Sequence, residues 1–197
     1  MPDQEMPLSV CTETYPIMLL KDAIYLVKEA EAGRAKRADN REIPSPMERA
    51  AARAAIFTAF NLLEGLLIEL TQKRISNGPT KCSHCNETIL EELKSARASV
   101  SRTITEWPLT VLGVCIAGMA EFGKFKEIRI LRNHLIHPKL ETQANSERTQ
   151  DDLLKECNSQ RCKQVLYEIV RMCNVLYTVY GQSVPQEFCN VLNDMKP

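Results

Sequence analysis

An arginine, an asparagine and a histidine lie close together in the segment from Lys124 to Lys139, which reads KFKEIRILRNHLIHPK. A guanidinium group stays charged and its fork matches phosphate oxygens. An imidazole gives or takes a proton near neutral pH, and an amide can orient either group. Arg132, Asn133 and His137 are therefore candidates for chemistry on a phosphodiester. On residue types alone, Arg132 could equally pair with a helix acid and His137 could cap a helix.

The apolar residues of this segment predict the helix that positions these groups. Three of them recur at helical spacing, Ile128, Leu131 and Leu135. Pro138 disfavours helical backbone at His137, so we expect the helix to end there, where its C-terminal end favours a protonated ring. Arg132 lies five residues earlier, a little over one turn at ~1.5 Å per residue. Both side chains can therefore reach one small anionic group.

The pattern Arg132-Asn133-x-x-x-His137 resembles the signature of the HEPN (higher eukaryotes and prokaryotes nucleotide-binding) superfamily. In that family an arginine, usually followed by a polar residue, precedes a histidine. A second segment, Arg53 to Leu70, is similar to the long buried helix that many members carry ahead of the motif, with Glu64 at its polar position. The resemblance implies an all-α helical bundle, often a homodimer, and a metal-independent ribonuclease without cofactors. Many members serve as toxins or in phage defence.

The resemblance also assigns roles to these residues. His137 would act in acid–base chemistry at the ribose 2′-hydroxyl or the leaving 5′-oxygen. Arg132 would stabilise charge in the transition state, and Asn133 and Glu64 would orient these groups; the alternative for Glu64 is a carboxylate that faces water. Two motifs would meet across the two-fold axis of a dimer. Lys139 stands where a toxin subgroup carries a modifiable tyrosine, so that modification is not expected here.

The charge pattern limits RNA contact to a local patch. Formal net charge is zero, so no global field attracts nucleic acid. The candidate RNA-binding residues belong to the motif segment: Lys124, Lys126, Arg129 and Lys139. Neutral charge favours an alternative, a non-catalytic helical module that dimerises or binds a nucleotide or a protein. A partner protein such as an antitoxin is compatible with the ribonuclease.

The cysteines give a weak metal candidate and an indication of compartment. Cys82 and Cys85 have the spacing of half a tetrahedral zinc site, but no second half is evident, so an ordinary turn is expected. Eight cysteines and no signal peptide indicate reduced thiols in a cytoplasmic protein. Cys115 and Cys173 are expected to be small buried hydrophobic residues. The apolar run at 109–120 is too short to span a bilayer, so no membrane association is expected.

The remaining pattern predicts one all-α domain, an up-and-down helical bundle of about five to six helices over residues 14–197, after a flexible arm at residues 1–13. Ser45-Pro46-Met47-Glu48 is a capping box that begins the long helix. Residues 109–120 form either a short buried helix or a packed loop. Besides the motif helix, helices are expected at about 15–33, 46–75, 88–106, 151–180 with one possible break, and 184–195.

Overall fold

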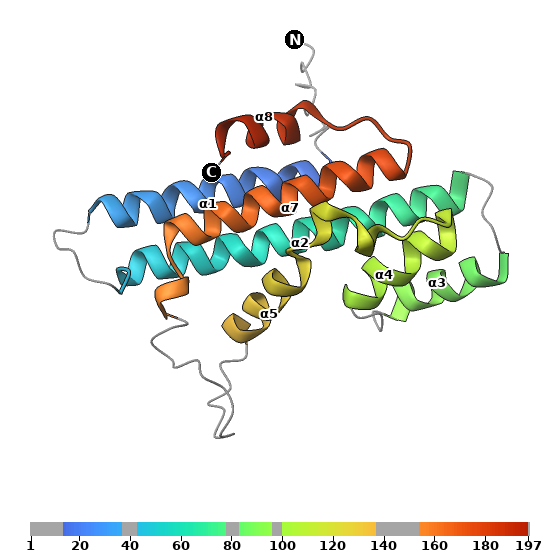
Figure 1. The fold of residues 1–197 in the computed structure, drawn as a ribbon, viewed down its shortest axis with the longest axis horizontal. Helices are drawn as coiled ribbons and strands as arrows, with labels where there is room; N and C mark the ends of the chain where they lie inside the picture. The colour runs from blue at the N-terminus through green and yellow to red at the C-terminus, as the bar shows by residue number, and fades with distance from the viewer. Residues whose placement is uncertain (1–13, 37–42, 78–82, 96–99, 137–153, 197) are drawn as a thin grey trace, which may run out of the picture.

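The computed structural model describes residues 14–36, 43–77, 83–95, 100–136 and 154–196. Within these ranges the chain forms seven longer α-helices, a short helical stretch at residues 154–156, two 3-10 helices and no β-strand (Figure 1). The all-α fold class is confirmed. The predicted count of about five to six helices is too low, because the segment predicted as one helix at 88–106 contains residues of both α3 (Ser83–Ser95) and α4 (Val100–Leu112).

Two long antiparallel helices, α1 (Tyr15–Ala35) and α2 (Pro46–Asn77), lie side by side. The predicted cap of α2 is present, since the Glu48 backbone N–H donates to Ser45 Oγ over 3.1 Å. The two helices approach closely at Gly33. A Cβ added there would lie 2.9 Å from the Glu48 backbone nitrogen, so this approach requires a glycine.

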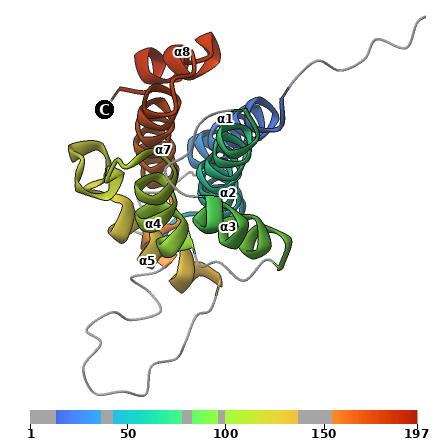
Figure 2. The same ribbon diagram turned by 90° about the vertical axis from the view of Figure 1, so that its right-hand side faces the viewer.

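Helix α7 (Ser159–Val179) packs along both α1 and α2, and α8 (Gln186–Asp194) packs on α7 (Figures 1 and 2). The predicted break before α7 is present: residues 154–156 are helical, and Asn158 then caps α7 by accepting from the Arg161 backbone N–H over 2.8 Å. Gly181, with φ of 69°, follows the end of α7.

Helix α2 forms the centre of the bundle. Its 32 residues span about 48 Å at ~1.5 Å per residue. Its length and apolar composition would also allow a membrane crossing, but most of the apolar stretch is buried inside the structure, and this burial accounts for the composition. Five apolar residues near its middle are at most 1% exposed, namely Phe60, Leu62, Leu63, Leu66 and Leu67.

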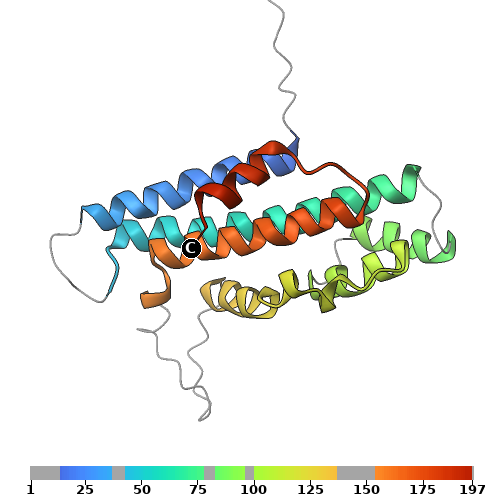
Figure 3. The same cartoon turned by 45° about the horizontal axis from the view of Figure 1, so that its top comes forward.

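Helices α3 and α4 lie near the C-terminal half of α2 and have a small apolar core of their own (Figures 1 and 3). Its buried residues are Ile89, Trp107 and Val111. Trp107 Nε1 donates to Glu92 Oε2 over 3.2 Å, and Glu92 also pairs with Arg102 at 2.7 Å. Helix α4 continues through Pro108, so the predicted end before Trp107 is wrong.

Residues 113–124 connect α4 to the motif helix through two 3-10 helices, Ile116–Gly118 and Ala120–Phe122. The segment predicted at 109–120 as a short buried helix or a packed loop is therefore divided: residues 109–112 end α4, and the rest contains the first 3-10 helix and the start of the second. Cys115 lies in extended backbone before the first 3-10 helix and is exposed, which corrects the prediction that it is buried. Cys173 is buried in α7 as predicted.

The motif helix is α5 (Phe125–Ile136), which packs against α2 (Figure 3). Its predicted apolar stripe is confirmed, since Ile128 and Leu131 are buried and Leu135 is partly buried against the same core. The predicted end of this helix at His137 lies outside the described residues.

Candidate functional site

Arg132 lies at the edge of α5 that faces α2. Its guanidinium carbon is 5.2 Å from the centroid of the Phe60 ring. Phe60 is 1% exposed, and its ring stacks on that of Phe125 with centroids 6.1 Å apart and planes 18° apart. An aromatic face attracts a cation through its quadrupole. The Phe60 ring therefore lies beneath the Arg132 guanidinium, and the Phe125 ring of α5 stacks on it.

Asn133 holds one edge of the same guanidinium. Arg132 Nη1 donates to Asn133 Oδ1 over 3.1 Å. A guanidinium carries five N–H donors in one plane, and in the described part of the chain this is the one hydrogen bond of the Arg132 side chain. The remaining donors are available to an anion.

Glu64 lies one turn after Phe60 on α2 and is half-buried. Burial raises the pKa of Glu64, and the nearby charge of Arg132 lowers it by a smaller amount. Among the described residues, no hydrogen bond or salt bridge links Glu64 directly to Arg132, so the two groups interact electrostatically at longer range. The carboxylate is thus placed beside the guanidinium without occupying its donors.

Replacing Glu64 with glutamine is expected to raise the thermal stability at pH 7. The folded-state pKa of Glu64 is above its unfolded value, so the folded protein binds this proton more tightly. That contribution to stability is fully present below the unfolded pKa, near 4.5, and is lost as pH rises through the folded pKa. Melting temperatures of both proteins at pH 7 and pH 4 check this. At pH 7 the melting temperature of Glu64→Gln should be slightly higher than that of the parent, and the difference should be smaller at pH 4. A lower melting temperature of the variant at pH 7 would contradict the prediction.

Of the two histidines in the motif segment, His134 is among the described residues and His137 is not. His137, the predicted acid–base group, lies outside the described residues. His134 is two residues from Arg132, about 200° around the helix, so it lies on the opposite edge of α5. Its Nδ1 atom is buried without a hydrogen-bond partner among the described residues. His134 therefore does not share the surface of Arg132.

The predicted RNA-binding residues that the structure describes do not form one patch. Lys124 Nζ pairs with Glu127 Oε2 at 2.9 Å, and Arg161 Nη2 donates to Glu127 Oε1 over 2.6 Å. The hydrogen bonds from Arg161 and then Lys124 hold the pKa of Glu127 below its usual range. The charge of Lys124 is therefore largely balanced.

Of the other predicted RNA-binding residues, Arg129 is half-buried and lies three residues before Arg132, on an adjacent position of the same helix surface. Lys126 is exposed and lines a cavity of about 310 Å³ together with Glu127 and Arg161. Lys139 lies outside the described residues. The structure thus brings Arg129, but not Lys126, close to Arg132.

The weak zinc candidate is not assembled in the described part of the chain. Cys82 lies outside it, and Cys85 is placed in α3 by its backbone only. Among the residues that the structure describes, no cluster of three or more histidine, cysteine, aspartate or glutamate residues could hold a metal ion.

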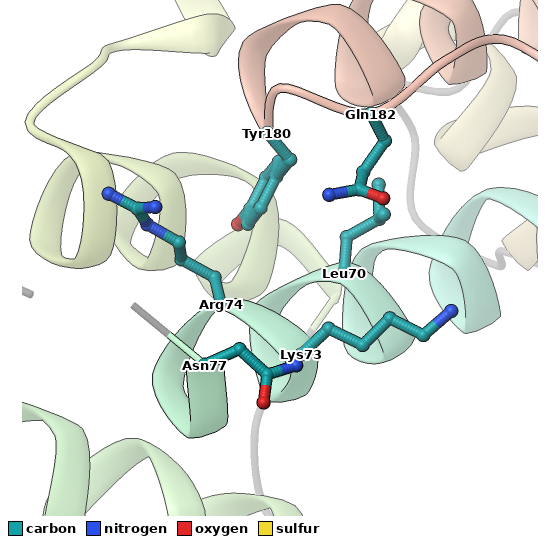
Figure 4. A pocket seen from close by; sticks show the side chains of 6 residues that line it. All are labelled: Leu70, Lys73, Arg74, Asn77, Tyr180 and Gln182. Carbon is teal, nitrogen blue, oxygen red and sulfur yellow. The ribbon is translucent and has the colours of Figure 1, made fainter. Parts of the chain in front are cut away.

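A separate polar cavity of about 210 Å³ lies between the C-terminal ends of α2 and α7 (Figure 4). Its lining includes Lys73, Arg74 and Tyr180. Tyr180 is hydrogen-bonded to Thr71 through their hydroxyl oxygens, 2.8 Å apart, and burial raises the pKa of Tyr180 to about 12. Basic side chains at a helix C-terminus complement the helix dipole, which accounts for the two cations. The lining residues that belong to α2 begin ten residues after Phe60. The cavity therefore lies at least ~15 Å from Phe60 along the helix.

Sequence reasoning missed Phe60 and Phe125 as parts of the site. A signal for them existed: Phe60 precedes Glu64 by four residues, and Phe125 precedes Arg132 by seven. Both intervals place two side chains on one face of a helix. The two phenylalanines were predictable as neighbours of the polar groups, although their mutual stacking was not.

Comparison with models of known protein families found no match, and neither did comparisons with characterised proteins or with solved structures. The fold defines a helical bundle, and the arguments for its function come from the side chains around Arg132.

Proposed function

We propose that the protein is a metal-independent endoribonuclease of the HEPN type, built as a single-domain HEPN-like bundle and acting as a toxin or phage-defence effector. One observation carries the proposal. The Arg132 guanidinium lies against Phe60, is bonded to Asn133, is near Glu64, and keeps its other donors open, on a helix that leads directly to His137. A fixed, always charged fork of this kind suits a phosphodiester.

In the proposed reaction the ribose 2′-oxygen bonds to phosphorus and the bond from phosphorus to the 5′-oxygen breaks. His137 takes the proton of the 2′-hydroxyl or gives a proton to the leaving 5′-oxygen. Arg132 donates to the phosphoryl oxygens as negative charge develops on them. Asn133 and Glu64 orient Arg132. The products carry a 2′,3′-cyclic phosphate on one strand and a 5′-hydroxyl on the other.

We further propose that two copies form the active enzyme, because one arginine and one histidine are few groups for this reaction and a two-fold axis supplies a second pair. Arg129 adds a cation beside Arg132, and Lys126 and Lys139 extend the contact with RNA. Lys124 contributes less because Glu127 pairs with it. An antitoxin would act by covering this surface.

The test is incubation of the purified protein with mixed RNA in excess chelator, beside the Arg132→Ala and His137→Ala variants. The proposal requires that the parent cleaves and that both variants do not. If cleavage persists in either variant, the assignment of that residue is wrong. If the parent cleaves only after a divalent ion is added, the metal-independent mechanism is wrong.

A non-catalytic helical module that dimerises or binds a nucleotide or a protein is the second candidate. The balance of charge around Glu127 favours it, since Lys124 and Arg161 are both paired there. Intact RNA after incubation with the parent, together with a stable complex between protein and a nucleotide or partner, would select this second function.

A further inference from the structure

We infer that Phe60 is a positioning residue of the site: the face of its ring holds the Arg132 guanidinium in the orientation that presents the open N–H donors to a phosphate. The inference rests on the proposed function and extends it to a buried residue outside the motif. It is drawn from the placement of three side chains, Phe60, Phe125 and Arg132.

The Phe60 ring is itself held in place. It is 1% exposed at the centre of α2 and stacks on Phe125, which is 9% exposed at the start of α5. Packed interiors leave such rings little room to move. Because one ring comes from each helix, the stack also fixes how α5 lies on α2 at the level of the site.

The guanidinium then gains an orientation that the arginine side chain alone would not have. Arginine has many rotamers, and ordering them reduces its entropy. Contact with the ring face at 5.2 Å favours rotamers in which the flat cation lies over Phe60. In this arrangement Asn133 holds one donor, while the ring blocks one face. Among the described residues, the remaining donors have no hydrogen-bond partner.

Glu64 complements the ring without competing with the ligand. It is on the same helix as Phe60 and its charge acts on Arg132, yet in the described part of the chain it takes none of the guanidinium donors. The ring thus restricts the tilt of the guanidinium, and the carboxylate attracts it toward α2. A phosphate can approach from the remaining side.

The test compares Phe60→Leu with Phe188→Leu in the full-length chain. Each variant removes one ring of a buried aromatic pair from the same core, so similar losses of thermal stability are expected. Phe60 contacts Arg132, whereas Phe188 lies in α8 and packs on Tyr177. We therefore expect about tenfold lower kcat for cleavage of a labelled single-stranded RNA in Phe60→Leu, with KM changed less. Phe188→Leu should retain kcat within about threefold.

A second readout does not depend on catalysis. In the NMR spectrum of the parent, the Arg132 Nε–H resonance, assigned by its loss in Arg132→Lys, should be shifted by the ring current of Phe60. The shift should disappear in Phe60→Leu and persist in Phe188→Leu. A parent that cleaves no RNA but shows this shift would refute the proposed function and leave the placement of Arg132 intact. An unshifted resonance, or equal loss of kcat in both variants, would overturn the positioning role.

Discussion

Replacing Arg132 with lysine is expected to lower the rate of RNA cleavage by about 100-fold or more, while the free energy of unfolding changes by less than about 1 kcal/mol. Lysine keeps the positive charge but lacks the planar fork that bonds two oxygens and lies flat on an aromatic ring. The contact with Phe60 and the bond to Asn133 are both lost. Single-turnover cleavage and thermal melting of the two proteins measure the two quantities.

Arg129→Lys is the matched control for this experiment. Arg129 is also a half-buried arginine of α5, one turn before Arg132, but no aromatic contact or hydrogen bond of its side chain is present within the described residues. We expect its cleavage rate to stay within about threefold of the parent, as for a cation that contributes to RNA binding alone. Equal losses in the two variants would show that charge, and not the geometry of Arg132, matters.

Replacing Glu48 with alanine is expected to destabilise the fold by about 2–4 kcal/mol. Glu48 is 1% exposed, and its Oε1 accepts from the Ser159 backbone N–H over 3.0 Å, at the first turn of α7. A carboxylate there complements the positive end of the helix dipole. The alanine variant leaves a buried donor without its acceptor and opens a cavity where α2 meets α7. Urea denaturation gives the difference directly.

Two further variants show whether the effect belongs to this contact. Glu31→Ala removes a carboxylate that pairs with Lys163 of α7 at 3.7 Å on the surface, and we expect a change below about 1 kcal/mol. Glu48→Gln keeps an oxygen acceptor in a side chain of nearly the same shape, so its loss should be smaller than that of Glu48→Ala. If Glu48→Ala were as stable as the parent, the interhelical bond would contribute nothing.

Much of the fold was predictable because its signals are local. Pro16 lies in the first turn of α1, and Ser45 and Pro46 begin α2, at the positions where the sequence predicted them. The end of α4 was not predicted, since Pro108 normally interrupts a helix. Here Ile104, Trp107 and Val111 continue one apolar stripe across the proline, and their burial outweighs the missing backbone hydrogen bond.

The site was predictable only to the extent that its residues are close in sequence. The motif placed Arg132 and Asn133 together, and the polar position of the long helix indicated Glu64. The capping box placed Glu48 in the first turn of α2. It did not predict that the Glu48 carboxylate accepts a hydrogen bond from the backbone of Ser159, 111 residues further along the chain. Such a contact depends on how α7 docks, which no local pattern contains. The same holds for the stacking of Phe60 on Phe125.

The small core around Trp107 predicts that one end of the molecule opens before the rest. Ile89, Trp107 and Val111 form this core together with Ile68 and Ile75 of α2, and Leu112 connects it to the main cluster. Amide hydrogens of α3 and α4 should therefore exchange by partial opening, at lower free energy than those of α2 and α7. Because Trp107 is the single tryptophan of the chain, tryptophan fluorescence reports on that opening alone. The fluorescence should change at a lower denaturant concentration than the helical circular dichroism signal does.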